Sequence, residues 1–266
     1  MTIQTLYTAA TGMNSLETKL DVIANNMANI NTTAFKRDRA NFEDLMYRNY
    51  KLPGNLDAQN NPTPTGIKVG LGSRVQSVQS EFRQGAMQQT GKPLDVAIEG
   101  NGFFEVLDTT GNVVYTRAGN FSVNANGQLV LGSAQTGRVL QAGVTVPPDA
   151  TDVSINANGQ VMVRQPGSQN LNAVGQMNIS TFVNPEGLLK LGENLYINTD
   201  ASGQAISSTP QTNGAGALRS GSLEASNVEP VQELIDLITT QRAFELNSQI
   251  VQAGDQILQL VSNLRR

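Results

Sequence analysis

The chain has 266 residues and a net charge of −4, and it contains no cysteine, histidine or tryptophan. These absences exclude disulfides and thiol nucleophiles, and they remove the commonest general base and transition-metal ligand. The 18 Lys and Arg residues are scattered, so no basic stripe indicates nucleic acid or an anionic membrane as a partner. We expect no cofactor and no metal site.

Near the N-terminus, apolar side chains recur at alternating steps of three and four. This spacing predicts a helix over residues 3–31, whose stripe fills the a and d positions of about four heptads. The stripe consists of Leu6, Ala9, Met13, Leu16, Leu20, Ile23, Met27 and Ile30. All of them except Ala9 are candidate self-assembly residues.

The middle of the chain changes character twice. Residues 51–66 hold three prolines and two glycines, which predicts a loop or an extended arm. Residues 67–218 contain short runs of β-forming residues separated by turn residues. Asn-Gly pairs at 126–127 and 158–159 predict two hairpins, because both residue types accept positive φ.

The C-terminal stretch predicts a second long helix with two apolar stripes. Ser226 or Asn227 can cap its start, and Pro230 is tolerated in the first turn. One stripe consists of Ala243, Leu246, Ile250, Ala253, Ile257, Leu260 and Leu264. The other runs beside it at intervals of seven and consists of Leu237, Phe244, Val251 and Leu258. Apart from the two alanines and Leu264, these are also candidate self-assembly residues.

The predicted fold is mainly β with long terminal α-helices, which pair as a coiled-coil-like domain, together with an inserted β-rich body and an extended arm. Residues 1–34 and 225–266 form the helical assembly domain. Residues 35–75 are a connecting segment with the arm or hairpin, and residues 76–224 are a β-rich outer domain.

The heptad stripes predict a partner, because their apolar residues stay in water until something covers them. One helix of the same chain could cover the first helix's stripe, but not both stripes of the last helix. We therefore expect self-association with neighbours on two sides, which can propagate into an open assembly. The alternative is that both helices fold back onto the β body.

No residue pattern indicates catalysis. Asp95 and Glu99 are four apart on a predicted strand, and would lie about 13 Å apart along it, beyond the ~5–9.5 Å of a glycosidase pair. The serines have no histidine to activate them. We expect no enzyme, with a cell-wall-acting enzyme and a carbohydrate-binding β domain as the alternatives.

Several long motifs resemble one protein family. "ANNMANINTTAFKR" at 24–37 looks like the N-terminal signature of the bacterial flagellar rod and hook family. "GSLEASNVEPVQELIDLITTQRAFELNSQIVQAGDQIL" at 221–258 looks like its C-terminal signature, and "KPLDVAIEGNGFFEV" at 92–106 resembles its middle. Rod members fit better than hook members, because hook proteins usually carry a larger middle.

The resemblance implies a structural subunit of a hollow helical shaft that crosses the periplasm and transmits torque from motor to hook. The implied partners are copies of itself, proximal rod proteins, hook or hook-junction proteins, periplasmic and outer-membrane ring proteins, and the flagellar type III export apparatus. Nucleic acid and direct membrane insertion are not expected. Export would use no cleaved signal peptide, and the first twenty residues lack the basic and apolar regions of one.

The resemblance also gives a reason for the asparagines that end the first predicted helix. Asparagine is a mediocre helix former, yet Asn25, Asn26 and Asn29 lie on the flanks of the stripe. In a packed tube these amides could bond to neighbouring copies without burying charge. The alternative is solvated surface. Two residues depart from the family pattern: Ala34 replaces a common glycine, so we do not expect a positive φ there, and Phe244 replaces a common tyrosine.

Overall fold

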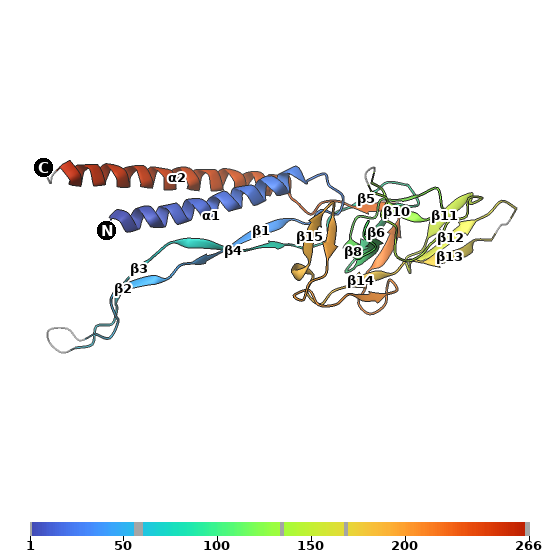
Figure 1. Cartoon of the computed structure of the whole chain (residues 1–266), viewed down its shortest axis with the longest axis horizontal. Coiled ribbons are helices and arrows are strands. Elements are labelled where there is room, and N and C mark those ends of the chain that lie inside the picture. Colours follow the sequence, from blue (N-terminus) through green and yellow to red (C-terminus); the bar gives the residue numbers. More distant parts are fainter. Residues whose placement is uncertain (1, 56–60, 134–135, 168–169, 264–266) are drawn as a thin grey trace. The chain divides into compact units, whose positions relative to one another are not determined.

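The computed structural model describes residues 2–55, 61–133, 136–167 and 170–263. The chain divides into two compact units, each built from separated segments. Unit 1 comprises residues 1–28, 38–80 and 229–266, and unit 2 comprises residues 29–37 and 81–228. The coarse prediction of a mainly β chain with a helix near each end is confirmed (Figure 1).

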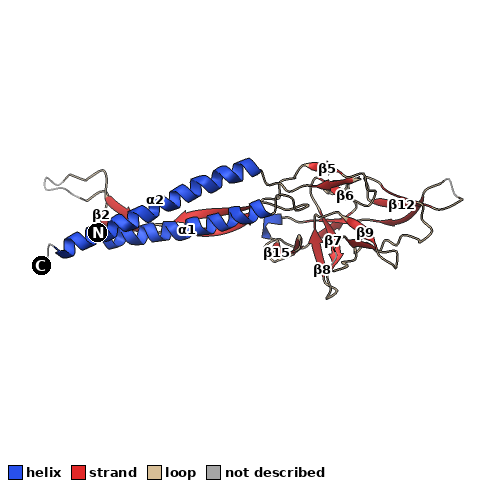
Figure 2. Ribbon diagram, turned by 90° about the horizontal axis from the view of Figure 1, so that it is seen from above, coloured by secondary structure: helices blue, strands red, loops and turns tan. Residues whose placement is uncertain are grey.

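Unit 1 contains both helices, α1 (Thr2–Ala28) and α2 (Pro230–Asn263). They lie side by side in both views of the chain (Figures 1 and 2). Pro230 is the first residue of α2, where its missing N–H would have had no helical partner in any case. The prediction that Ser226 or Asn227 caps this helix is wrong, because Asn227 accepts from the Arg37 backbone N–H (2.7 Å) and the Ser226 hydroxyl accepts from the Val228 N–H (3.3 Å), which precedes the helix.

Unit 1 also contains two antiparallel strand pairs, which we call the ribbon. Its strands are β1 (Asp38–Asp44), β2 (Tyr47–Lys51), β3 (Ile67–Gly70) and β4 (Ser73–Ser80), with β1 paired to β4 and β2 to β3. The ribbon lies along α1, since the Ser15 hydroxyl donates to the Ser73 carbonyl (3.3 Å). At Gly72, φ is +117°, and a Cβ would lie 2.0 Å from the Thr11 hydroxyl, so only glycine fits. The predicted arm at 51–66 joins β2 to β3, and residues 56–60 lie outside the described residues.

Unit 2 is built from short antiparallel strands. Its six-stranded sheet has the order β15-β16-β8-β7-β14-β17, and β11-β12-β13 form a three-stranded sheet. The pairs β9–β10, β6–β18 and β5–β19 complete it. The elements are β5 (Met87–Gln89), β6 (Val96–Glu99), β7 (Phe103–Leu107), β8 (Val113–Thr116), β9 (Phe121–Val123), β10 (Leu129–Leu131), β11 (Asp152–Ile155), β12 (Gln160–Arg164), β13 (Asn172–Gln176), β14 (Ile179–Thr181), the 3-10 turn η1 (Pro185–Gly187), β15 (Leu189–Gly192), β16 (Leu195–Ile197), β17 (Ile206–Ser208), β18 (Ala217–Ser220) and β19 (Ser222–Glu224).

Both hairpins predicted from Asn-Gly pairs are confirmed. They join β9 to β10 and β11 to β12. In each turn the glycine takes a positive φ, +77° at Gly127 and +84° at Gly159, while the preceding asparagine does not. The Asn124 side chain accepts a hydrogen bond from the Asn126 N–H (2.9 Å), which stabilises the first of these turns.

Two apolar clusters hold unit 2 together. The larger cluster lies beneath the sheets and includes Val96, Ile98, Phe104, Val106 and Val161, all fully buried. The smaller cluster is aromatic, and its rings meet edge-on or tilted with centroids 4.8–5.8 Å apart. Its aromatic members are Phe82, Phe103, Tyr115, Phe182 and Tyr196, and Leu188 is buried with them.

The segment 29–37 belongs to unit 2, although it directly follows α1. Ala34 in this segment is buried, and its N–H donates to the Glu224 carbonyl (2.8 Å). Its φ is +57°, so the expectation that alanine would avoid a positive φ here is wrong. The surrounding contacts therefore hold a conformation that an L-residue adopts at a cost of about 1 kcal/mol.

Candidate assembly surface

One face of α2 is covered by α1. Leu237, Val251 and Leu258 lie on this face and are half-buried. They belong to the second predicted stripe, for which we expect a partner helix. The helices approach closely at Gly254, where a Cβ would lie 2.6 Å from a methyl group of Leu6. Phe244 lies at the edge of this face and is more exposed.

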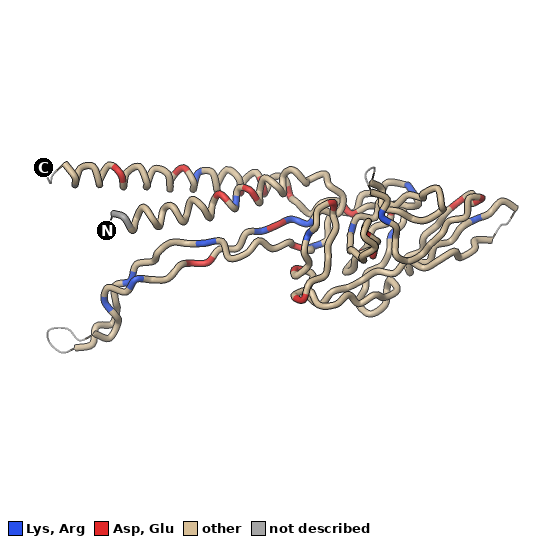
Figure 3. The backbone as a smooth tube through the Cα atoms, viewed as in Figure 1, with Lys and Arg blue, Asp and Glu red and all other residues tan. Residues whose placement is uncertain are grey.

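A second face of α2 is open along its C-terminal half. Leu246, Ile250, Ile257 and Leu260 are between 45% and 64% exposed, and Ala253 between them is also exposed. These are residues of the first predicted stripe, whose last member, Leu264, lies outside the described residues. Charge is sparse here, since the stretch from Leu246 to Leu260 carries a single charged residue, Asp255 (Figure 3). We call this face the open stripe.

The predicted assembly residues of α1 are largely covered by the chain itself. Ile23 is buried, and the others are half-buried between α2 and the ribbon. The half-buried residues of α1 are Leu6, Met13, Leu16, Leu20 and Met27. Ile30 and Asn29 follow the end of α1 and are half-buried in unit 2.

The structure gives Asn26 a different environment from the one expected. Asn26 is 1% exposed, so it does not lie on a flank open to a neighbouring copy. Its amide donates to the Asp38 carbonyl and accepts from the Asp38 N–H, both at 2.9 Å, and donates to Glu233 at 3.4 Å. These three bonds use the carbonyl acceptor and the N–H donors of the one amide. Asn25, its neighbour, is exposed.

Sequence reasoning missed an exposed apolar row on the ribbon. Met46 is 82% exposed, and Tyr47, Tyr50 and Ile67 are about half exposed or more. Tyr47 and Tyr50 each lie under a cation, Lys68 and Arg48 respectively. Met46, Tyr47 and Tyr50 do not alternate along the chain, and every residue of β2 is exposed, so the sequence carries no strand pattern that identifies this surface.

Sequence reasoning also missed a buried ion cluster that joins segment 29–37 to the rest of unit 2. Glu224 accepts from Lys36 (2.7 Å) and from Arg117 (2.8 Å), and none of the three side chains is more than 4% exposed. Lys36 also donates to the Arg83 carbonyl (2.8 Å), and the Gly85 N–H donates to Glu224 (2.9 Å).

The charges in this cluster shift one another's pKa values. Burial, together with the Arg117 charge, lowers the pKa of Lys36 to about 8. Burial alone would raise the pKa of Glu224, but the charges of Arg117 and Lys36 hold that pKa below its ordinary value. The cluster is therefore an ionised triad at neutral pH.

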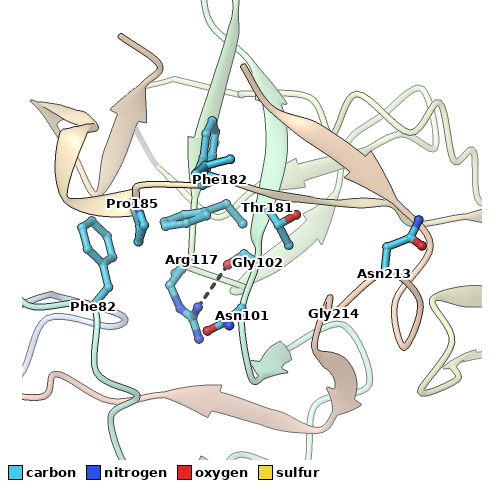
Figure 4. Close-up of a pocket in the computed structure, with 11 residues that line it drawn as sticks. Phe82, Asn101, Gly102, Arg117, Thr181, Phe182, Pro185, Asn213 and Gly214 are labelled. Atoms are coloured by element: carbon cyan, nitrogen blue, oxygen red, sulfur yellow. Dashed lines mark hydrogen bonds between the residues drawn. The ribbon is translucent and has the colours of Figure 1, made fainter. Parts of the chain in front are cut away.

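Unit 2 has a pocket of about 340 Å³ beside this cluster (Figure 4). Arg117 lies at its wall and donates to the Gly102 carbonyl (3.1 Å), while Phe182 and Pro185 supply apolar surface. Arg117 is fully engaged by Glu224 and by carbonyls, so the pocket presents no reactive side chain with a partner base. The described residues contain no group of three side chains placed to hold a metal ion. Within the same residues, no helix is long and apolar enough to cross a membrane.

Comparisons with known proteins match the whole chain. Three family descriptions fit in order: flagella basal body rod protein (residues 6–36), flagellar hook protein FlgE/F/G D1 domain (97–163) and flagellar basal body rod FlgEFG protein C-terminal (219–264). The flagellar basal-body rod protein FlgG of Caulobacter vibrioides is 43% identical, over 99% of this chain and 100% of that protein. FlgG of Buchnera aphidicola subsp. Schizaphis graminum is 41% identical (98% and 100%), and FlgG of Borreliella burgdorferi is 40% identical (99% and 99%).

Proposed function

The chain belongs to the family of flagellar basal-body rod proteins, and we propose that it is the subunit of the distal rod. It is a structural subunit of the flagellar basal body and not an enzyme. Identity to FlgG proteins over nearly the whole chain supports the distal rod. A proximal rod or hook subunit of the same family is the alternative.

The proposed mechanism is helical self-assembly into a hollow tube through the terminal helices. The observation that carries it is the open stripe of α2, whose four large aliphatic side chains are about half exposed. Covering them would contribute about 3–6 kcal/mol per contact, against an association cost of about 4–15 kcal/mol. The surface of the neighbouring copy that covers them contributes a similar amount, so one contact can hold two copies together at high concentration, and contacts with further neighbours stabilise the tube.

The paired helices act in this proposal as a coiled-coil-like assembly domain, residues 1–34 with 225–266, and residues 76–224 face outward. Close approach at Gly254 and the half-buried Leu237, Val251 and Leu258 support the pairing. Ile23 and Asn26 contribute by holding α1 in place, because the chain itself buries them. Asn25, which is exposed, keeps the role of contacting a neighbour.

The arm within residues 35–75 stiffens the shaft in this proposal. Its exposed row, including Met46 and Tyr47, offers apolar surface for a neighbouring copy. The rod family associates with other rod and hook components, and the proposed partners are proximal rod proteins, the hook or its junction proteins, the surrounding rings and the type III export apparatus. The subunit would reach the periplasm through that apparatus.

The test is whether the purified chain, free of other proteins, forms straight tubes by electron microscopy. Straight tubes are expected of a rod subunit, and curved or bendable ones would favour a hook subunit. A chain that stays monomeric at high concentration would contradict the mechanism. A muramidase assay on the same sample addresses the wall-acting alternative, and we expect no activity.

A further inference from the structure

A second open apolar face lies at the N-terminal end of α2. Val231, Leu234, Ile235 and Ile238 are spaced i, i+3, i+4 and i+7, which places them on one face of the helix. They are between 45% and 71% exposed. Four aliphatic side chains in this spacing form a continuous two-turn surface, which we call the open patch.

The open patch and the open stripe lie on different sides of the face that α1 covers. If Thr240 and Gly254 on the covered face are heptad position a, the patch occupies positions b, c and f and the stripe occupies d and g. The pattern reverses along the helix. Near the patch the d and g positions are polar, with Gln232 and Asp236. Beside the stripe the b, c and f positions are polar and exposed at Gln249, Gln252, Asp255 and Gln256.

We propose that the open patch of one copy packs against the open stripe of the next copy, with the two α2 helices parallel. This inference rests on the proposed self-assembly and names the contact. The spacing of the two surfaces matches, because 231, 234 and 238 advance by the same steps as 250, 253 and 257. A shift of nineteen residues, about 28 Å at 1.5 Å per residue, brings Val231 to Ile250, Leu234 to Ala253 and Ile238 to Ile257.

A second copy is the occupant that covers both surfaces at once. Pairing patch with patch would leave both stripes in water, and pairing stripe with stripe would leave both patches there. Pairing patch with stripe leaves one free surface at each end, so the contact repeats and the assembly grows open-ended. The small Ala253 at the centre of the stripe leaves room for Leu234.

The test uses two variants that each keep one surface. The patch variant is Ile235→Asp with Ile238→Asp, the stripe variant is Leu246→Asp with Ile250→Asp, and the control is Gln252→Asp with Gln256→Asp on the polar face. By size-exclusion chromatography with light scattering, each of the first two should stay at 28.4 kDa alone. Their mixture should form a one-to-one complex of twice that mass, and the control should assemble as the unaltered chain does. Circular dichroism checks that all are folded.

Other outcomes separate this inference from the proposed function. If either variant dimerises alone, or if the mixture stays monomeric while the unaltered chain assembles, self-assembly holds but the patch-to-stripe contact is wrong. If both variants polymerise like the unaltered chain, α2 is not the interface and the proposed mechanism fails as well.

A covalent test does not depend on losing assembly. The chain has no cysteine, so Leu234→Cys with Ala253→Cys introduces two thiols on one helix, about 28 Å apart and unable to bond within a chain. Mild oxidation of assembled protein should give a ladder of covalent oligomers. Leu234→Cys with Gln256→Cys should give none. No ladder from the first pair, or equal ladders from both, would overturn the contact.

Discussion

Removing the negative charge from the buried ion cluster should strongly destabilise unit 2. Glu224→Gln keeps the shape of the side chain but leaves Lys36 and Arg117 buried together without a counter-charge. Breaking a buried ion pair by removing one partner typically costs about 3–5 kcal/mol. Because the three side chains are almost fully buried, water cannot replace the lost carboxylate, and we expect a loss within this range at pH 7.

The pH dependence of stability should change as well. In the unaltered chain the pKa of Lys36 is about 8, below its ordinary value of 10.5. The unfolded state therefore binds more protons between these values, and the free energy of unfolding rises with pH across this window. Glu224 raises the pKa of Lys36, so in Glu224→Gln that pKa falls further and the rise begins at lower pH.

Urea unfolding followed by tyrosine near-ultraviolet circular dichroism measures both effects, because Tyr115 and Tyr196 lie in the aromatic cluster of unit 2. The matched control is Glu81→Gln, whose ion pair with Arg37 is longer (3.9 Å) and partly exposed, so it should cost less than about 1 kcal/mol. Adding Lys36→Met to Glu224→Gln should recover part of the loss. The reasoning is refuted if Glu224→Gln costs no more than the control.

Three further changes test other parts of the account. Asn26→Ala should cost about 2–4 kcal/mol in urea unfolding, since it removes the hydrogen bonds that the buried Asn26 amide makes with the N–H and carbonyl of Asp38, while exposed Asn25→Ala should change stability by less than about 0.5 kcal/mol; equal effects would contradict the assigned contacts. Ala34→Val should cost about 2–4 kcal/mol, because a β-branched residue strains at a φ of +57° in a buried site, and Ala34→Gly should stay within about 1 kcal/mol. Deleting residues 51–66 should leave assembly intact but give a bendable filament by electron microscopy, and unchanged stiffness would remove the arm from the account.

Local patterns in the sequence were sufficient for the helices and for two hairpins. The three-four spacing identified α1 and α2, because a helix repeats its surface within a few residues. The Asn-Gly pairs identified the turns before β10 and β12 for the same local reason. The turn between β15 and β16 carries no such signal. Glu193 takes a positive φ in this turn, although glutamate rarely adopts one.

Contacts between distant residues could not be read in this way. Asn26 is satisfied by Asp38 and Glu233, and Lys36 by Glu224, far along the chain. Nothing in the neighbouring residues specifies such partners, so the sequence alone places Asn26 on an outer flank and indicates no role for Lys36. The open patch was missed for a different reason: two helical turns are too short to compete with stripes that run for several heptads.

The central claim, that α2 is the assembly interface, is tested most directly by replacing Leu246 and Ile250 with aspartate and measuring polymerisation by sedimentation and electron microscopy. Both side chains are about half exposed or more, so the change should leave the circular dichroism of the β strands intact. We expect a folded chain that no longer forms filaments. Filaments that still form from this variant would contradict it.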